Sequence, residues 1–145
     1  MDESFSRTAI QLGADAVERL CHARVAVFGI GGVGGYTVEA LARSGIGTLD
    51  LFDDDRVSVS NINRQIIATH DTVGQYKIDA AAARIRSINP TAVVHAHKVF
   101  YLPQTASEID LTVYDYIVDA IDTVAGKIAL IEAAFTANIP IISCM

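Results

Sequence analysis

A glycine-rich turn follows the apolar segment 24–28 and precedes a stretch with helical periodicity. It fits the pattern G-x-G-x-x-G, in which the first glycine permits a tight turn, the second lets the backbone approach a phosphate, and the third lets helix and strand pack closely. Unpaired N–H groups and the helix dipole favour an anion there. The glycines of this turn are Gly29, Gly31, Gly32 and Gly34. We therefore predict that the turn binds a nucleotide, in preference to a turn that serves packing alone.

Asp53 ends the next apolar segment, 48–53. A carboxylate at the end of a second strand can accept hydrogen bonds from both hydroxyls of a ribose. NAD-dependent dehydrogenases share this arrangement. The glycine turn and Asp53 therefore predict a bound nucleotide without identifying it.

Two basic residues, Arg64 and Lys77, follow Asp53 in a polar loop and at the start of a later helix. The diphosphate of NAD carries about two negative charges, which a helix N-terminus largely accommodates, whereas ATP carries about four. A reaction at the α-phosphate of ATP releases pyrophosphate, and cations stabilise the charge that develops on this leaving group. Arg64 can bind phosphate oxygens bidentately, and Lys77 adds a point charge. The pair favours ATP, although its spacing also fits two ordinary solvated side chains.

A second acidic stretch, Asp119 to Asp122, lies at the end of another apolar segment. Ligands of open α/β sheets bind outside the carboxyl ends of the strands, where the strand order reverses. Asp122 is placed to hold Mg²⁺ against a triphosphate, because Mg²⁺ takes carboxylate and phosphate oxygens. It could equally be the N-cap of the following helix, and the two roles are compatible. Asp119 lies closer to the strand, so we expect it to be structural.

These residues require an alternation of strands and helices to bring them together. Residues 1–23 are expected to form an N-terminal helical segment, and residues 24–145 a nucleotide-binding domain with a Rossmann-like, doubly wound α/β fold. With right-handed crossovers, the predicted parallel sheet has the strand order 3-2-1-4-5. The expected strands are 24–29, 48–53, 92–99, 116–119 and 139–144, and the expected helices of this domain are 36–43, 77–88 and 124–138.

The composition is that of one domain of ordinary size, with 145 residues, 51% of them hydrophobic and 19% charged. No apolar run reaches the length of about 18 residues that a membrane span needs. The first residues lack the basic and apolar regions of a signal peptide, so we expect a cytoplasmic protein. The net charge of −6 argues against this chain being a nucleic-acid-binding surface by itself.

Several residues that can do chemistry are not assigned to the site. Cys21 and Cys144 form no metal or redox spacing and are expected to be buried, although a role for Cys144, near the expected cleft, stays open. His95 and His97 share one face of a strand, but no carboxylate or cysteine joins them, so we expect a solvated sheet edge. Tyr101 is expected to pack around a loop.

Taken together, the motifs resemble those of the ubiquitin-activating-enzyme-like adenylyltransferases (ThiF/MoeB-like proteins) over essentially the whole chain. The marks of that family are a G-x-G-G-x-G turn, an acidic residue after the second strand, an S-N-x-x-R-Q loop, a downstream lysine and a D-x-x-D strand end. The resemblance implies catalytic roles for Arg64, Lys77 and Asp122, with Asp122 also binding Mg²⁺. It implies that ATP is bound by Arg7, Gly29, Gly31, Gly32, Gly34, Asp53, Asp55, Asn61, Arg64, Gln65 and Lys77. Arg7 matches an arginine that in relatives can reach ATP from a neighbouring subunit.

Within that family, the stretches 28–47 and 141–145 are most similar to the branch of tRNA threonylcarbamoyladenosine dehydratases. The implied reaction is ATP-dependent adenylation of the carboxylate of N6-threonylcarbamoyladenosine 37 in tRNA, followed by cyclisation with release of AMP. The alternatives are adenylation of the C-terminal glycine of a ubiquitin-like sulfur-carrier protein, an NAD-binding oxidoreductase, and a non-catalytic nucleotide-binding module.

The resemblance also implies the partners. Relatives continue beyond the length of this chain, so we expect it to be the N-terminal portion of a longer enzyme. Most contacts with tRNA would then lie outside these residues, and this portion alone would be inactive on tRNA. We expect a homodimer and leave open a sulfur-transfer or carrier protein as a further partner.

Overall fold

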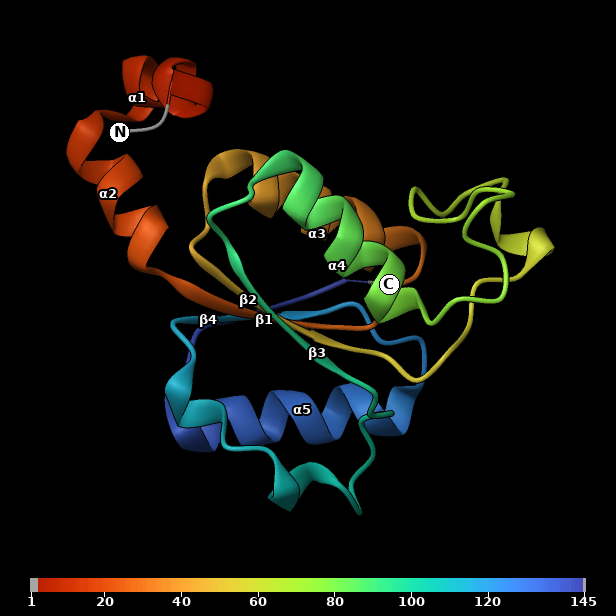
Figure 1. The fold of residues 1–145 in the computed structure, drawn as a ribbon. Helices are drawn as coiled ribbons and strands as arrows, with labels where there is room; N and C mark the ends of the chain where they lie inside the picture. Colours follow the sequence, from red (N-terminus) through yellow and green to blue (C-terminus); the bar gives the residue numbers. More distant parts are fainter. Residues whose placement is uncertain (1–2, 145) are drawn as a thin grey trace.

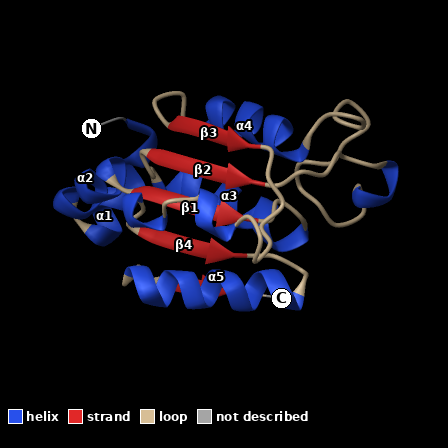
Figure 2. Cartoon of the chain, turned by 90° about the horizontal axis from the view of Figure 1, so that it is seen from below, coloured by secondary structure: helices blue, strands red, loops and turns tan. Residues whose placement is uncertain are grey.

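The computed structural model describes residues 3–144, which form a five-stranded parallel sheet with helices on both faces. The strands are β1 Arg24–Phe28, β2 Thr48–Phe52, β3 Val93–His97, β4 Tyr116–Asp119 and β5 Ile141–Ser143. Their order is β3-β2-β1-β4-β5 (Figure 2). The predicted doubly wound fold and its strand order are therefore confirmed.

Three helices sandwich the sheet, with α3 and α4 on one face and α5 on the other (Figure 1). The helices are α1 Ser6–Leu12, α2 Ala14–His22, α3 Gly32–Ser44, α4 Lys77–Ile88 and α5 Val124–Ala137. Short 3-10 turns are Glu3–Phe5, Val59–Asn61, Ala106–Glu108 and Leu111–Val113. The helices α1 and α2 lie at the amino-terminal ends of the strands (Figure 2).

The core consists of two apolar layers that share the central strands. Val25 and Val27 of β1 pack with α3 and α4 on one face, whereas Ala26 and Phe28 pack with α5 on the other. Alternate residues of a strand point to opposite faces, so a central strand covered on both sides must be apolar throughout. This explains why the continuous apolar run 24–28 predicted β1 correctly.

Element boundaries differ from the predictions mainly at the site. The helix expected from residue 36 begins at Gly32, so the end of the glycine turn is also the first turn of α3. The last strand is shorter than expected and comprises only Ile141–Ser143. Gly45 ends α3 in the left-handed conformation, as glycine commonly does after a helix.

A buried carboxylate corrects the expectation for the two histidines. Asp50 of β2 is fully buried and pairs with Arg24 (Nε–Oδ2 2.8 Å), His97 (Nε2–Oδ1 2.8 Å) and His95 (Nδ1–Oδ2 3.3 Å). Burial opposes ionisation of Asp50, but the Arg24 guanidinium and the two histidines outweigh it and lower its pKa to about 2. The expectation that no carboxylate joins the two histidines is wrong, because parallel pairing places Asp50 of β2 directly beside His95. The expected solvated sheet edge is confirmed, since β3 is an edge strand and His95 is exposed.

Candidate nucleotide-binding site

A cavity of about 400 Å³ lies at the carboxyl ends of β1, β2 and β4. The sheet order reverses between β1 and β4, which is where ligands of doubly wound folds bind. The polar residues that line the cavity are Asp53, Asp54, Asp55, Arg64, Gln65, Lys77, Tyr101, Asp122 and Cys144, together with Gly29, Gly31 and Gly32 of the turn. The structure thus brings together most of the residues that the sequence singled out.

The glycine turn has the geometry expected of its first and third glycines. Gly29 has a φ of 89°, and a Cβ there would lie 2.5 Å from the carbonyl oxygen of Ala120. A Cβ at Gly34 would lie 1.7 Å from the carbonyl oxygen of Gly29. Gly34 therefore serves close packing and does not line the cavity, whereas Gly31 and Gly32 do.

Asp53 is held at the junction between β2 and the glycine turn. Its Oδ2 accepts a hydrogen bond from the backbone N–H of Ile30 (2.7 Å), and its Oδ1 accepts one from the N–H of Asp55 (2.8 Å). Burial raises the pKa of the Asp53 carboxyl above its ordinary value, and the two N–H groups oppose this shift. The side chain is thereby fixed at the cavity in one orientation.

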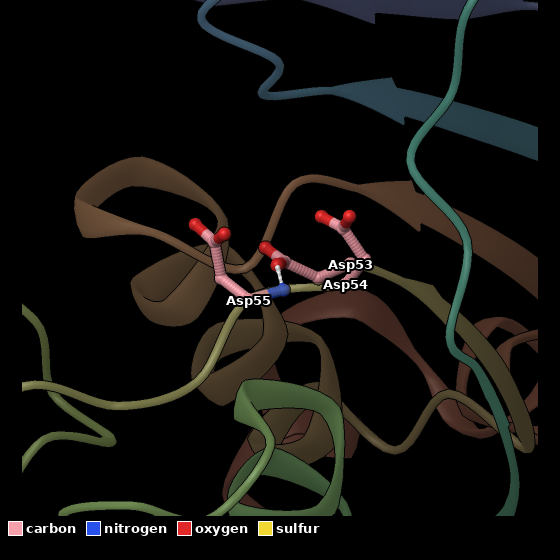
Figure 3. A group of neighbouring side chains, drawn as sticks. All are labelled: Asp53, Asp54 and Asp55. Carbon is pink, nitrogen blue, oxygen red and sulfur yellow. Dashed lines mark hydrogen bonds between the residues drawn. The ribbon is translucent and has the colours of Figure 1, made fainter.

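Three consecutive carboxylates, Asp53, Asp54 and Asp55, lie close together beside the glycine turn (Figure 3). One oxygen of each lies within 4.8 Å of the others. Both oxygens of Asp53 already accept backbone hydrogen bonds, and Asp55 forms an ion pair with Lys77 (Oδ2–Nζ 3.0 Å). A cation here would therefore compete with Lys77 for Asp55.

Lys77 and Arg64 reach the cavity from different elements. Lys77 is the first residue of α4 and is buried, with 7% of its surface exposed. Arg64 is exposed, and its Nη1 donates to the carbonyl oxygen of Ser60 and to Oδ1 of Asn63, both at 2.9 Å. Its Nε and Nη2 make no hydrogen bond within residues 3–144 and could bind an anion.

The loop that carries Arg64 is shaped by Asn61. The side chain of Asn61 accepts a hydrogen bond from the N–H of Ser58 (2.9 Å), and its carbonyl oxygen accepts from the N–H groups of Arg64 and Gln65. Asn61 is buried and does not line the cavity. Gln65 does, and its Oε1 has no hydrogen-bond partner among the described residues.

Asp122 lies in the loop between β4 and α5, is exposed, and lines the cavity. It forms no ion pair or hydrogen bond with the described part of the chain. The N-cap of α5 is Thr123, without a side-chain capping bond, so the N-cap role considered for Asp122 is wrong. Asp119 is fully buried and pairs with Lys127, as expected of a structural residue.

Arg7 does not line the cavity of its own chain, and both cysteines are more exposed than expected. Arg7 belongs to α1, which lies where the strands begin, whereas the cavity lies at their carboxyl ends (Figure 2). The expected burial of Cys21 is wrong, because this residue near the end of α2 is exposed. Tyr101 lines the cavity, a position that the sequence did not predict. The signal that could have indicated this is its position shortly after β3, at the carboxyl end of a strand. Cys144 is partly exposed and lines the cavity, which corrects its expected burial.

Comparisons with known proteins give consistent results. The model of the ThiF family matches residues 5–145. A tRNA threonylcarbamoyladenosine dehydratase of Bacillus subtilis is 44% identical over 145 residues, which are 100% of this chain and 57% of that protein. A sulfur carrier protein adenylyltransferase of Thermus thermophilus is 36% identical over 91% of this chain and 48% of that protein.

A solved structure matches as well. The crystal structure of E. coli tRNA N6-threonylcarbamoyladenosine dehydratase in complex with ATP superposes with a TM-score of 0.92 at 41% identity, over 97% of this chain and 58% of that chain. The present chain spans about half the length of the curated relatives it matches. Among the described residues, no helix is long and apolar enough to cross a membrane.

Proposed function

Because this chain belongs to the ThiF family, we propose that it is the nucleotide-binding part of an enzyme that uses ATP to adenylate a carboxylate. The observation that carries the proposal is the convergence of Arg64, Lys77 and Asp122 on the cavity beside the glycine turn. Two cations match a triphosphate better than a dinucleotide diphosphate, because the departing pyrophosphate gains negative charge in the reaction.

In the proposed reaction, a carboxylate oxygen of the acceptor attacks the α-phosphorus of ATP. The bond between the α-phosphorus and the bridging oxygen breaks, and pyrophosphate leaves with that oxygen. The product is an acyl adenylate, whose AMP is a far better leaving group than a carboxylate oxygen. The carboxylate is already ionised at neutral pH, so this step needs no general base.

The described side chains divide this work by position. The backbone of Gly31 and Gly32 would bind phosphate, and Asp53 would accept hydrogen bonds from the ribose. Lys77 and the unused nitrogens of Arg64 would bind the triphosphate, and Gln65 would orient it. Asn61 would act through the shape of its loop, and Asp55 by holding Lys77 in place until the nucleotide binds. Donors and cations held in place before the reaction can stabilise the charge that develops on the phosphates in the transition state.

We propose that Asp122 binds Mg²⁺. Its carboxylate is exposed to the cavity and has no partner among residues 3–144, whereas Asp53 and Asp55 of the acidic cluster are engaged. Bound there with the triphosphate, Mg²⁺ would neutralise phosphate charge.

For the acceptor, we propose the threonylcarbamoyl carboxylate of adenosine 37 in tRNA, with AMP displaced as the modification cyclises. The support is the 44% identity to the dehydratase of Bacillus subtilis over the full chain. The second candidate is the C-terminal glycine of a sulfur-carrier protein, which the 36% identity to the Thermus thermophilus adenylyltransferase favours. A location in the cytoplasm, where tRNA is modified, accords with either acceptor.

We also propose that the enzyme is a homodimer. Ile128 and Phe135 of α5 are 52% and 87% exposed, and Ile142 of the edge strand β5 is 48% exposed. Apolar groups so exposed favour association. Arg7 lies in α1 and does not line the cavity of its own chain, so a role at the nucleotide would require a second subunit.

The experiment that tests the function is pyrophosphate exchange into ATP by a longer protein that contains this chain. Threonylcarbamoyl-modified tRNA and a sulfur-carrier protein are supplied as competing acceptors. We expect exchange that depends on the modified tRNA. Exchange that depends only on the carrier protein would replace the first acceptor with the second, and absence of exchange with both would refute adenylation.

A further inference from the structure

A buried lysine that does not line the cavity connects two segments that do, the turn after β4 and the end of β5. Lys127, in the first turns of α5, is only 8% exposed. Its Nζ lies 3.0 Å from Asp119 Oδ2, 3.0 Å from the carbonyl oxygen of Ile121 and 2.7 Å from the carbonyl oxygen of Cys144. An ammonium group has three N–H donors, and here each has an acceptor.

Asp119, the partner of Lys127 in the ion pair, also connects the turn after β4 to the end of β5. Its Oδ1 accepts a hydrogen bond from the N–H of Ile121 (3.0 Å), and its Oδ2 accepts one from the hydroxyl of Ser143 (2.6 Å). The backbone N–H of Cys144 donates to the carbonyl oxygen of Asp119 (2.8 Å). The end of β4, the turn after it and the end of β5 are therefore joined around one buried ion pair.

Both segments held in this way face the cavity. Ile121, Asp122 and Cys144 line it, and Asp122 directly follows the carbonyl that Lys127 binds. The N-cap residue of α5, Thr123, makes no side-chain capping bond, so the turn before α5 is held by backbone hydrogen bonds and by the contacts of Asp119 and Lys127. A buried polar cluster in which every donor and acceptor is hydrogen-bonded makes the surrounding structure rigid, because a displaced charged group would lose its partners.

We infer that Lys127 is a positioning residue for the nucleotide site, which fixes the Ile121–Asp122 turn and the Cys144 segment at the distances that ATP requires. The inference rests on the proposed function, because it assumes that the cavity binds ATP. Lys127 itself acts through the two carbonyl oxygens and does not touch the nucleotide.

The test compares Lys127→Met, which keeps the length of the side chain but removes its donors, with Lys127→Arg, which restores charge and donors. Arg86→Met, which removes an exposed cation of α4, is the control. Two quantities are measured on the 145-residue chain. They are the Kd for Mg-ATP by calorimetry and the alkylation rates of Cys144 and Cys21 by N-ethylmaleimide, without nucleotide, read by peptide mass spectrometry.

We expect Lys127→Met to raise the Kd for Mg-ATP about 10-fold or more and to speed alkylation of Cys144 at least 10-fold, while exposed Cys21 changes little. Lys127→Arg should return both quantities to within about 3-fold of the wild type. Partial unfolding would lower the stoichiometry of the titration without this change in Kd. If Lys127→Met does not fold, the double variant Asp119→Asn, Lys127→Met removes both buried charges and takes its place.

The two readouts separate failure of the inference from failure of the proposed function. Unchanged alkylation of Cys144 and unchanged Kd in the folded variants would overturn the inference. No binding of Mg-ATP by the wild-type chain would overturn the proposed function, and the alkylation rates would still decide whether Lys127 holds the Cys144 segment.

Discussion

The Oδ2 atom of Asp53 lies 2.7 Å from the backbone nitrogen of Ile30, so the carboxylate at the end of β2 is bonded to the glycine turn after β1. The same carboxylate accepts the N–H of Asp55. The ribose-binding candidate and the phosphate-binding candidate are thus one connected structure before any nucleotide binds. Such preorganisation reduces the ordering that binding would otherwise require.

Arg64→Ala should abolish adenylate formation and leave the fold intact. Arg64 is exposed and bonds only to its own loop, so we expect little change in Tm. Loss of a charge-assisted bidentate contact should raise the Kd for Mg-ATP about 10- to 100-fold. Calorimetry on this chain and pyrophosphate exchange on the longer protein measure the two effects. Arg86→Ala serves as the control, and wild-type exchange by Arg64→Ala would show that the phosphate assignment is wrong.

Two glycine substitutions separate packing from phosphate binding. A Cβ at Gly34 would meet a backbone oxygen at 1.7 Å, so Gly34→Ala should destabilise the fold by about 3 kcal/mol or more. The nearest atom to a Cβ at Gly31 is Gln65 Nε2 at 3.7 Å, an ordinary contact, so Gly31→Ala should fold normally.

Gly31→Ala should nevertheless raise the Kd for Mg-ATP about 10-fold or more, because its methyl group occupies the space of a phosphate that approaches the backbone. Urea denaturation and nucleotide titration of both variants test the pair. Tight Mg-ATP binding by Gly31→Ala would place the phosphates elsewhere in the cavity.

Asp122→Asn should alter the role of Mg²⁺ without altering the fold. The carboxylate is exposed and makes no bond within residues 3–144, so the free energy of unfolding should change by less than about 0.5 kcal/mol. In the wild type, Mg²⁺ should strengthen ATP binding, and in Asp122→Asn this gain should largely disappear. Titrations of ATP with Mg²⁺ and with EDTA measure the difference. An equal gain in both proteins would move the metal to other ligands, with Asp54 the next candidate.

Asp50 should govern part of the acid sensitivity of the fold. Its pKa falls from 3.8 to about 2 in the folded protein, so its ionised form stabilises the fold above pH 4, and this contribution is lost as the pH falls toward 2. The shift corresponds to about 2 kcal/mol. Asp50→Asn should therefore be less stable than the wild type at pH 7 by about this amount. The difference should shrink between pH 4 and pH 2 in urea denaturation, and a difference that stays constant with pH would contradict the assignment.

The sequence predicted what depends on local pattern. The run 24–28 is apolar because both of its faces are covered, and Gly29 is a glycine because its φ of 89° excludes most side chains. Both features can be predicted from residues that are adjacent in the sequence. The strand order followed from right-handed crossovers, which constrain topology independently of side chains.

What the sequence did not reveal depends on pairing across strands. Asp50 joins His95 and His97 only because β2 and β3 align in one register, and Lys127 meets Cys144 only because α5 packs beside β5. Tyr101 lines the cavity because the loop after β3 returns over the end of β1, where its ring packs on Phe28. No local pattern encodes such contacts between distant segments.

The measurement that tests the central claim most directly is thermal unfolding of the 145-residue chain with saturating Mg-ATP or with NAD. Ligand at about 100 times its Kd adds about 2.7 kcal/mol of stability, which for a chain of this size is a rise in Tm of about 5–10 °C. We expect this rise with Mg-ATP, its loss in Arg64→Ala, and almost no response to NAD. An equal or larger rise with NAD, or none with Mg-ATP, would contradict a triphosphate site formed by Arg64, Lys77 and Asp122.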